Sequence, residues 1–233
     1  MKIICMIPAR LGSQRVKKKN LRLINQKPLI QYVIDTLKKC DFFDQIYINS
    51  EAKIFEKIAK ENGISFYHRD KNLSSNKSTN DEFALDFINN VEGDVLLQVL
   101  PTSPLITSYE INNFVNYYKS NNIKTLISVC SHRIACLYKN KPINFNKLKM
   151  NPPSQNMTPI YSYSTVLMAW DFKIFKKNMS KYKSAYHGGS GKTDYFPLSP
   201  LASIDIDEEE DFLLVEKILL SNNLKNSKPR YYK

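Results

Sequence analysis

The chain has 233 residues, 42% hydrophobic and 24% charged, a composition that is typical of folded globular proteins and excludes a largely disordered chain. Its net charge of +12 comes from 34 Lys and Arg residues against 22 Asp and Glu residues, scattered along the chain instead of gathered in one block, which argues against a nucleic-acid partner. No apolar run approaches the ~20 residues that cross a bilayer, and no signal peptide precedes the first strand, so we expect a cytoplasmic protein without a membrane partner.

Strand-like and helix-like segments alternate from the start of the chain. This alternation predicts an α/β fold, a three-layer αβα sandwich built on a mainly parallel twisted sheet. The predicted strands are residues 2–7, 45–49, 64–67, 94–100, 125–129, 161–170 and 201–206. The predicted helices are residues 28–37, 52–62, 81–91, 109–120, 172–178 and 209–220. We predict one domain over residues 1–233, with an insertion at 131–157 where the pattern dissolves into Asn, Lys and Pro, and a polar tail at 221–233.

The first predicted strand ends in a loop that is rich in cations. Residues 8–15 read Pro-Ala-Arg-Leu-Gly-Ser-Gln-Arg, and Val16, three lysines and Asn20 complete what we name the cationic loop, residues 8–20. Guanidinium groups and the backbone N–H groups of a loop at a strand end can approach phosphate oxygens closely. The pattern therefore predicts a polyphosphate site.

Two aspartates lie near the end of the chain, in the segment Ser-Ile-Asp-Ile-Asp at 203–207. If this segment is a strand, alternation places Asp205 and Asp207 on one face, ~6.6 Å apart along the strand. Paired carboxylates beside substrate phosphates are a common way of holding Mg²⁺. The alternative is that the acidic residues 207–211 only stabilise the N-terminus of the helix that follows. We predict both roles, with Asp205 and Asp207 as metal ligands and residues 208–211 as helix-terminus charges.

Three of the 6 glycines stand at 188, 189 and 191, directly before Lys192 and Thr193. Gly-Lys-Thr matches the end of a P-loop, but position 186 is Tyr where that motif requires Gly, and no apolar strand precedes it. We therefore expect a flexible loop over residues 187–195. Two interpretations stay open: a plain surface loop, or a lid over a second substrate in which His187 or Lys192 touches an anionic group.

The cationic loop also resembles a known signature. Residues 7–21, Ile-Pro-Ala-Arg-Leu-Gly-Ser-Gln-Arg-Val-Lys-Lys-Lys-Asn-Leu, are similar to the nucleotide-binding segment of the CMP-sugar synthetases, the acylneuraminate and nonulosonate cytidylyltransferases. The resemblance implies a Rossmann-like, GT-A-like nucleotidyltransferase fold in which this loop binds the phosphates of CTP. The residues it assigns to the nucleotide are Pro8, Ala9, Arg10, Gly12, Ser13, Arg15, Lys19 and Asn20.

Three further segments resemble the same family. Ser-Ile-Asp-Ile-Asp matches its S-x-D-I-D segment, which implies that both aspartates hold the catalytic metal. Residues 69–75 resemble its R-P-x-x-L-A-S segment, which implies that Arg69, Ser75 and Ser78 contact the cytosine and ribose. Taken alone, this stretch also fits an ordinary polar loop. Residues 96–105 resemble its L-Q-P-T-S-P-L-R segment and place Thr102 beside the acceptor.

The acceptor half departs from the family pattern. Leu100 stands where the family has an acceptor-binding Gln, and Gln98, on the same strand face, is our candidate to replace it. Residues 161–167 occupy the place where sialic acid synthetases carry an acceptor-binding Arg, and no cation is present there, which argues against sialic acid itself. We assign acceptor contacts to Gln98, Thr102, Tyr161, Tyr163, His187 and Lys192.

These patterns together predict a CTP-dependent cytidylyltransferase that uses Mg²⁺, releases pyrophosphate and acts on a small anionic acceptor. The predicted catalytic residues are Arg10, Lys19, Asp205 and Asp207. By the resemblance, the acceptor is a nonulosonic, sialic-acid-like sugar destined for a surface polysaccharide, and the insertion builds a homodimer. Two alternatives stay open: a different small acceptor, sugar or not, and a non-catalytic protein of the same fold that binds a nucleotide or a nucleic acid.

Overall fold

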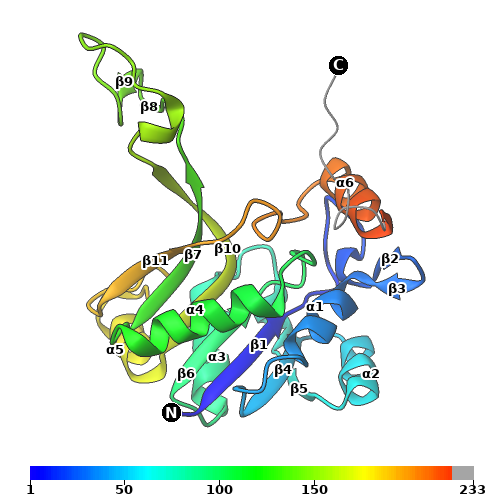
Figure 1. Cartoon of the computed structure of the whole chain (residues 1–233). Coiled ribbons are helices and arrows are strands. Elements are labelled where there is room, and N and C mark those ends of the chain that lie inside the picture. Colours follow the sequence, from blue (N-terminus) through cyan, green and yellow to red (C-terminus); the bar gives the residue numbers. More distant parts are fainter. Residues whose placement is uncertain (222–233) are drawn as a thin grey trace.

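The computed structural model, which describes residues 1–221, contains a seven-stranded sheet (Figure 1). In chain order its strands are β1 (Ile3–Pro8), β4 (Gln45–Ser50), β5 (Ser65–His68), β6 (Val95–Val99), β7 (Thr125–His132), β10 (Ile160–Asp171) and β11 (Thr193–Pro197). The spatial order is β11-β7-β10-β6-β1-β4-β5. Neighbouring strands are parallel except at β10, which runs antiparallel to both β6 and β7. The predicted mainly parallel sheet is therefore confirmed.

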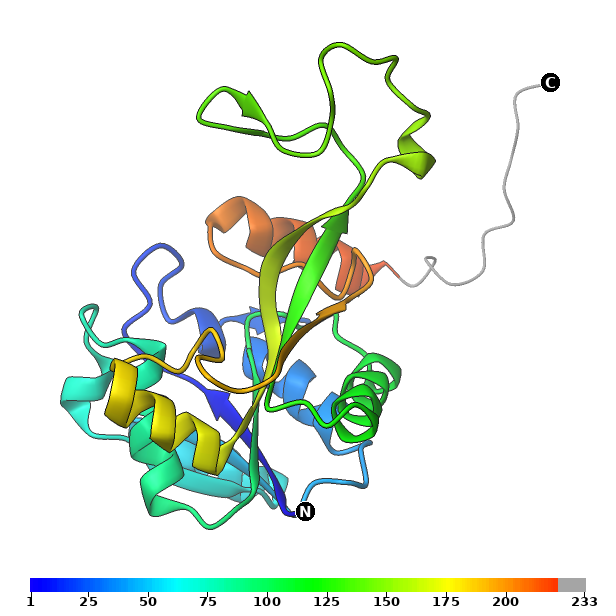
Figure 2. The ribbon, with the colours of Figure 1, turned by 90° about the vertical axis from the view of Figure 1, so that its left-hand side faces the viewer.

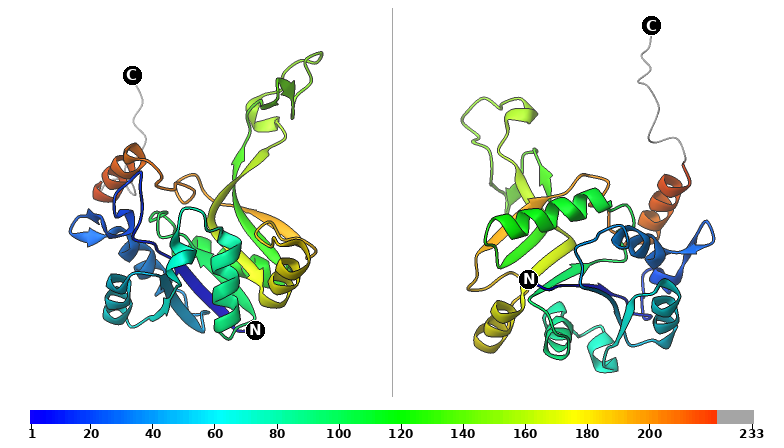
Figure 3. Two further views of the ribbon diagram at one scale, coloured as in Figure 1. Left: turned by 180° about the vertical axis from the view of Figure 1, so that it is seen from behind. Right: turned by 60° about the horizontal axis from the view of Figure 1, so that its bottom comes forward.

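Helices cover both faces of this sheet, so the predicted three-layer αβα architecture is also confirmed (Figure 2, Figure 3). One face carries α1 (Leu29–Leu37), α2 (Lys53–Asn62) and α4 (Ser108–Ser120), and the other carries α3 (Asn80–Asn90) and α5 (Phe172–Tyr182). The central strand β1 is apolar on both sides: Ile3, Cys5 and Ile7 pack under α1 and α4, while Ile4 and Met6 pack under α3 and α5. A strand buried on both faces is continuous in hydrophobicity, which is why residues 3–7 carry no polar side chain.

A third, smaller core holds the cationic loop against the last described helix. The ribbon of β2 (Leu23–Ile24) and β3 (Lys27–Pro28) packs with α6 (Glu209–Leu220), and Val16 of the loop is buried between them. Arg22 lies over the ring of Phe212, 3.8 Å from its centroid, and pairs with Glu209 at 2.6 Å. The fold thereby brings the loop after β1 beside the residues that precede α6, from opposite ends of the sequence.

The structure corrects two predicted segments. Residues 201–206, predicted as the last strand, form turns and coil, because their backbone bonds within itself, as from Ile204 N–H to Leu201 O at 3.2 Å. The additional strand is β11, in the segment predicted as a flexible loop, where Thr193 pairs with Thr125 of β7. Residues 193–197 have the β-forming side chains of an edge strand, but the glycines before them obscure this signal.

An arm projects from the body of the molecule where β7 and β10 run on beyond the sheet (Figure 1). It contains β8 (Leu137–Tyr138), β9 (Lys141–Pro142) and the 3₁₀ turn Ser154–Asn156. The predicted insertion, residues 131–157, lies at the end of β7 and in this arm, although its status as a separate subregion stays a prediction. Several of its large apolar side chains are exposed, namely Ile134, Leu137, Tyr138, Ile143, Leu148 and Met150.

Two predictions concern the chain as a whole. Among residues 1–221, no helix has the length and apolarity that crossing a bilayer requires. The predicted polar tail at 221–233 lies, except for its first residue, outside the described part of the chain.

Candidate functional site

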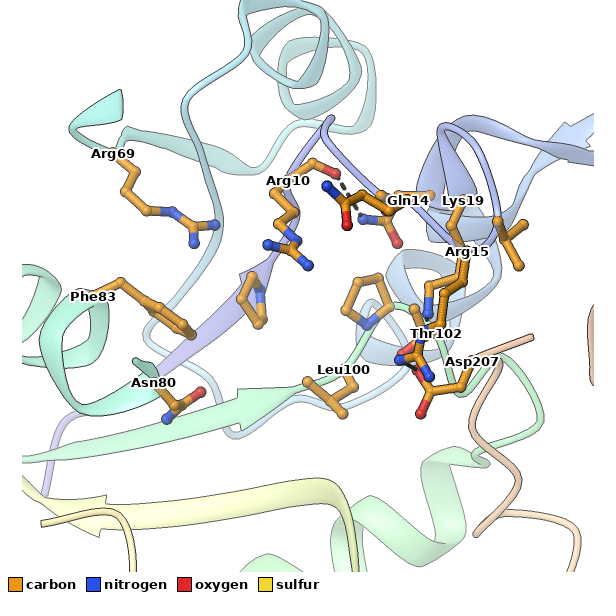
Figure 4. A pocket seen from close by; sticks show the side chains of 15 residues that line it. Arg10, Gln14, Arg15, Lys19, Arg69, Asn80, Phe83, Leu100, Thr102 and Asp207 are labelled. Atoms are coloured by element: carbon orange, nitrogen blue, oxygen red, sulfur yellow. Dashed lines mark hydrogen bonds and ion pairs between the residues drawn. The ribbon is translucent and has the colours of Figure 1, made fainter. Parts of the chain in front are cut away.

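A pocket of about 250 Å³ opens at the carboxyl ends of β1 and β6 (Figure 4). The chain leaves β1 toward α1 on one face of the sheet and reaches β6 from α3 on the other face. Such a reversal is where open α/β sheets bind their ligands. The lining comes from the cationic loop, the residue after β5, the start of α3, the turn after β6 and the segment before α6: Pro8, Arg10, Ser13, Gln14, Arg15, Val16, Lys19, Asn20, Arg69, Asn80, Phe83, Leu100, Pro101, Thr102 and Asp207.

Most of the predicted nucleotide residues of the cationic loop line this pocket, with two exceptions. Ala9 is buried and donates its N–H to Asn49 O at 3.0 Å, and Gly12 is exposed at the rim. A Cβ built on Gly12 would meet nothing within 4 Å, so packing does not require a glycine there. The lining cations lie at both ends of the pocket: Figure 4 shows Arg10 and Arg69 at one end and Arg15 and Lys19 at the other.

The predicted metal ligand Asp207 meets the cationic loop directly. Its Oδ1 accepts hydrogen bonds from Arg15 Nη2 at 2.9 Å and from Lys19 Nζ at 3.4 Å. Lys19 also donates to the backbone carbonyl of Ile206, and Arg15 donates to Glu208 at 2.9 Å. The loop after the first strand and the acidic segment near residue 207 therefore form one site.

The other predicted metal ligand, Asp205, lies deeper. Its carboxylate accepts hydrogen bonds from the hydroxyl of Thr102 and, at 3.1 Å, from that of Ser103, both in the turn after β6. Burial raises the pKa of the Asp205 carboxyl, and the hydrogen bond from Thr102 and the charge of Lys19 act against that rise. Ile206 N–H donates to Thr102 O at 3.0 Å, so the same turn holds both the backbone and the carboxylate of this segment.

The donor set formed by Asp205 and Asp207 fits a hard divalent cation. Both groups offer carboxylate oxygens, and Mg²⁺ is commonly held by one or two carboxylates together with oxygens of the substrate phosphates. Within residues 1–221, no three His, Cys, Asp or Glu side chains converge as a metal cluster. The residues are thus suited to a cation shared with a phosphate ligand, beside the cations that would bind that ligand.

Arg69 forms the far end of the pocket. Its Nη2 donates to Asn49 O at 2.6 Å, and its guanidinium lies 4.7 Å from the centroid of the Phe83 ring. Burial lowers the pKa of Arg69 to about 10, and the charge of Glu51 partly opposes this shift. A guanidinium packed on an aromatic ring in this way offers a flat, partly desolvated surface for a ligand.

Ser75 and Ser78 line a second hollow of about 220 Å³ that shares Arg10, Arg69 and Phe83 with the main pocket. Their hydroxyls lie 3.0 Å apart, and Ser78 donates to Asn72 O at 2.6 Å. The two serines therefore satisfy each other within a local turn. They nevertheless stand beside the predicted nucleotide arginines.

Several buried polar atoms around the pocket find no hydrogen-bond partner among the described residues. They are Asn20 Oδ1, Asn49 Oδ1, Arg69 Nε and Asn80 Nδ2. Leaving such a group unpaired costs about 1–3 kcal/mol. Because Asn20, Arg69 and Asn80 line the pocket, these atoms favour a polar ligand with hydrogen-bonding groups.

The predicted acceptor residues fall into three groups. Thr102 lines the pocket, but Gln98 does not, because it is fully buried in register with Met6 and Met168 on the neighbouring strands. Leu100, at the family's Gln position, lines the pocket instead. Gln98 Oε1 has no hydrogen-bond partner among the described residues. It is a buried polar atom and does not line the pocket.

Tyr163 and His187 belong to an aromatic cluster beside the site. Tyr163 Oη lies 3.3 Å from His187 Nδ1. The ring centroid of Tyr186 lies 5.0 Å from that of His187, and the ring centroid of Tyr195 lies 6.0 Å from that of Tyr163. Asp81 of α3 accepts the N–H groups of Ala185 and Tyr186 at 2.7 Å each. Because Asp81 directly follows Asn80, which lines the pocket, these bonds connect the cluster to the same end of α3. Tyr161, two residues before Tyr163, is half-exposed where β10 enters the arm.

The structure places Lys192 away from the pocket. Lys192 Nζ donates to Asn121 O at 2.7 Å, and its backbone carbonyl accepts the N–H of Thr125 at the start of β7. Since β6 and β7 are parallel, this position lies at the amino ends of the strands, opposite the pocket. The glycine segment before it is held against α5, since Asn178 Nδ2 donates to Gly188 O at 2.7 Å and Asn178 Oδ1 accepts the N–H of Ser190 at 3.1 Å. These contacts favour the interpretation as a surface loop.

Sequence reasoning missed six residues of the lining: Asn80, Phe83, Gln14, Val16, Leu100 and Pro101. A signal for the first two existed. Thr79 and Glu82 form a reciprocal capping box, which fixes the start of α3 and so aims Asn80 and Phe83 at the pocket. The spacing of Thr79 and Glu82 is visible in the sequence, but the direction of the helix is not.

Curated proteins with known names are similar to this chain. Among curated proteins, the N-acylneuraminate cytidylyltransferase of Streptococcus agalactiae serotype V is 28% identical over 226 residues, which cover 92% of this chain and 52% of that protein. The chain thus spans about half the length of the first relatives it matches. The CMP-N,N'-diacetyllegionaminic acid synthase of Legionella pneumophila is 27% identical over 235 residues, which cover 95% of this chain and 98% of that protein.

A solved structure shares the fold. CMP:2-keto-3-deoxy-manno-octonic acid synthetase, complexed with CTP, superposes with a TM-score of 0.73 at 12% identity, covering 94% of this chain and 98% of that one. The family model described as Cytidylyltransferase matches residues 4–188. That match spans most of the chain, and the chain therefore belongs to the cytidylyltransferase family.

Proposed function

We propose that this protein transfers CMP from CTP to a hydroxyl group of a sugar acid and releases pyrophosphate. The observation that carries the proposal is the meeting of Arg15 and Lys19 with Asp207 in one pocket at the ends of β1 and β6. Cations suited to a triphosphate and carboxylates suited to a divalent cation are the two requirements of nucleotidyl transfer. A cytoplasmic location follows for an enzyme that draws on CTP.

In this proposal the cationic loop binds the triphosphate. Arg10 approaches from one end of the pocket and Arg15 and Lys19 from the other, so that their charges offset the negative charge that grows as pyrophosphate leaves (Figure 4). Of the loop residues, Arg10 and Lys19 are the ones to which we assign a catalytic role. Asn20 offers its unpaired Oδ1 to a ribose hydroxyl. Most of the rate enhancement comes from positioning and charge, without a protein nucleophile.

Asp205 is proposed as the proton acceptor. The acceptor hydroxyl oxygen forms a bond to the α-phosphorus, the bond from that phosphorus to the bridging oxygen of pyrophosphate breaks, and the hydroxyl proton passes to the carboxylate. Burial raises the pKa of Asp205, which makes it a stronger base than a solvated aspartate. Thr102 and Ser103 orient the carboxylate.

Asp205 and Asp207 would also hold Mg²⁺. When bound there, the cation offsets phosphate charge and acidifies the attacking hydroxyl. The chain's own residues must rearrange for this, because Asp207 is paired with Arg15 and Lys19 before any ligand arrives. The same exchange would free both cations for the phosphates.

The cytidine end of the nucleotide is proposed to lie at Arg69. Phe83 and the guanidinium stacked on it provide a flat surface, and Ser75 and Ser78 offer hydroxyls in the adjoining hollow. Arg69 Nε and Asn80 Nδ2 are unpaired donors on this side of the pocket. Carbonyl and ring-nitrogen acceptors such as those of a pyrimidine would satisfy them.

For the acceptor we propose a nonulosonic acid, the class that the names of several relatives contain. Tyr161, Tyr163 and His187 would form its wall, with Thr102 nearest the reacting hydroxyl. Such a wall recognises the apolar face of a sugar ring and its acyl groups, and His187 offers the hydrogen bond to a carboxylate. The product would supply a surface polysaccharide.

We also propose that the arm builds a homodimer. Leu148 and Met150 are 94% and 95% exposed, and the arm carries further apolar side chains that the described residues leave uncovered. A patch of this kind marks an interaction surface.

The experiment is a pyrophosphate-release assay with CTP, Mg²⁺ and a panel of sugar acids that includes several nonulosonic acids. Release with one acceptor, with CTP preferred over the other nucleoside triphosphates, supports the proposal. Asp207→Asn should abolish release, and Glu210→Gln, an exposed neighbour in α6, should not. No release with any acceptor, together with tight binding of RNA, would replace the proposal with the non-catalytic alternative.

A further inference from the structure

We propose that Glu51 is a positioning residue for the nucleotide: it holds the cationic loop in its binding conformation through the backbone N–H of Leu11. The inference rests on the proposed function, because the ligand of the loop is the triphosphate of CTP. Glu51 follows β4, lies outside the four segments that carry the family resemblance, and does not line the 250 Å³ pocket.

The contact is short and lies in the middle of the phosphate-binding stretch. Glu51 Oε1 accepts the N–H of Leu11 at 2.9 Å, between Arg10 and the pair Gly12 and Ser13. Two residues earlier in each segment, Asn49 O accepts the N–H of Ala9 at 3.0 Å. The end of β4 therefore holds the loop at two points, and only the contact made by Glu51 depends on a side chain.

The loop gains from such an anchor because its other contacts are few: Arg10 donates to Asn76 at 3.0 Å and accepts from Asn20 at 3.4 Å, and Leu11 packs partly on the core. Gly12 is exposed and has open space where a Cβ would be, and Ser13 N–H bonds within the loop to Leu11 O at 3.0 Å. A loop held by few contacts samples many conformations, and ordering it on binding costs free energy. Glu51 makes that ordering part of folding instead of part of binding.

Glu51 also supplies negative charge beside Arg69. Two charges act on the pKa of Arg69 in opposite directions: that of Glu51 raises it, and that of Arg10 lowers it. Burial opposes ionisation of Glu51, but the N–H of Leu11 and the charge of Arg69 together hold its pKa below the usual value. The carboxylate thus stays charged, outside the pocket lining, while the two arginines face into it.

The test compares Glu51→Ala with Glu51→Gln in the full chain. Glutamine retains an oxygen that can accept from Leu11 N–H, whereas alanine does not. We expect Glu51→Ala to weaken CTP binding, measured by calorimetry, about tenfold and to speed amide hydrogen exchange of residues 9–15 about as much, since one hydrogen bond to a backbone donor is lost. Glu51→Gln should stay within about threefold of the wild type in both measurements.

The matched control is Glu56→Ala, which removes the same charge from an exposed position five residues further along, in α2. It should leave both measurements unchanged. Unaltered exchange in Glu51→Ala, or a glutamine variant as impaired as the alanine variant, would overturn the inference. If the wild type itself failed to bind CTP, the proposed function would fall, while the exchange data would still decide whether Glu51 anchors the loop.

Discussion

Arg15 Nη2 lies 2.9 Å from Asp207 Oδ1, a contact between residues 192 positions apart. It joins a predicted phosphate ligand to a predicted metal ligand, and each neutralises the other. Both side chains are about half exposed, so the pair contributes little to the free energy of unfolding. In the proposed function, this ion pair must break so that Arg15 can bind the triphosphate and Asp207 can hold the cation.

We expect Asp207→Asn to lower the rate of pyrophosphate release by at least about 100-fold, because a carboxylate proposed to hold Mg²⁺ is lost. The melting temperature should change by less than about 3 °C, because the lost ion pairs are exposed. Rates and calorimetric melting curves check both outcomes. Retained activity would remove Asp207 from the proposed metal site.

Glu208→Gln should tighten CTP binding in the absence of Mg²⁺ by roughly two- to fivefold, the size of a surface ion pair. The reason is that Arg15 Nη1 donates to Glu208 at 2.9 Å and would be released toward the phosphates. Calorimetric titration with CTP measures the change. Glu210→Gln, in the same helical turn but without an ion-pair partner among residues 1–221, is the control and should bind as the wild type.

The acidic limb of the pH profile should report Asp205. A protonated Asp205 cannot accept the hydroxyl proton, so activity should fall as the pH drops through its pKa. Because the hydrogen bond from Thr102 lowers that pKa, Thr102→Val should raise it and move the acidic limb of kcat/KM to higher pH. Ser103→Ala, which removes the smaller contribution, should shift the limb less. A limb that stays in place in Thr102→Val would exclude Asp205 as the base.

Replacing Leu148 and Met150 together with Asp should convert the proposed homodimer into a monomer without unfolding the body. Both side chains are almost fully exposed in one copy, so the change costs stability only where a second copy covers them. Sedimentation of the wild type and the variant measures the assembly. Leu213→Asp on α6, which is 44% exposed, serves as control. A monomeric wild type would contradict the dimer.

Much of the fold could be predicted from the sequence because its signals are local. The apolar run of β1, the amphipathic helices and Gly63, which ends α2 at a φ of 66°, each depend on a few neighbouring residues. The cationic loop and the Ser-Ile-Asp-Ile-Asp segment were also recognisable locally, by residue type and spacing. The wrong prediction also came from a local signal. The alternation of residues 201–206 is typical of a strand, but their backbone does not pair with any strand of the described sheet.

By itself, the sequence determined which residue types could bind phosphate and metal. Only the tertiary structure decided which of them meet. The small core beneath α6 brings Arg15 to Asp207. Sheet order buries Gln98 between two methionines and carries Lys192 to the amino ends of the strands, opposite the pocket. The physical reason is that these contacts link residues far apart in the chain, and the energy that selects them, burial on both faces of the sheet, is a property of the whole packed core and of no single segment.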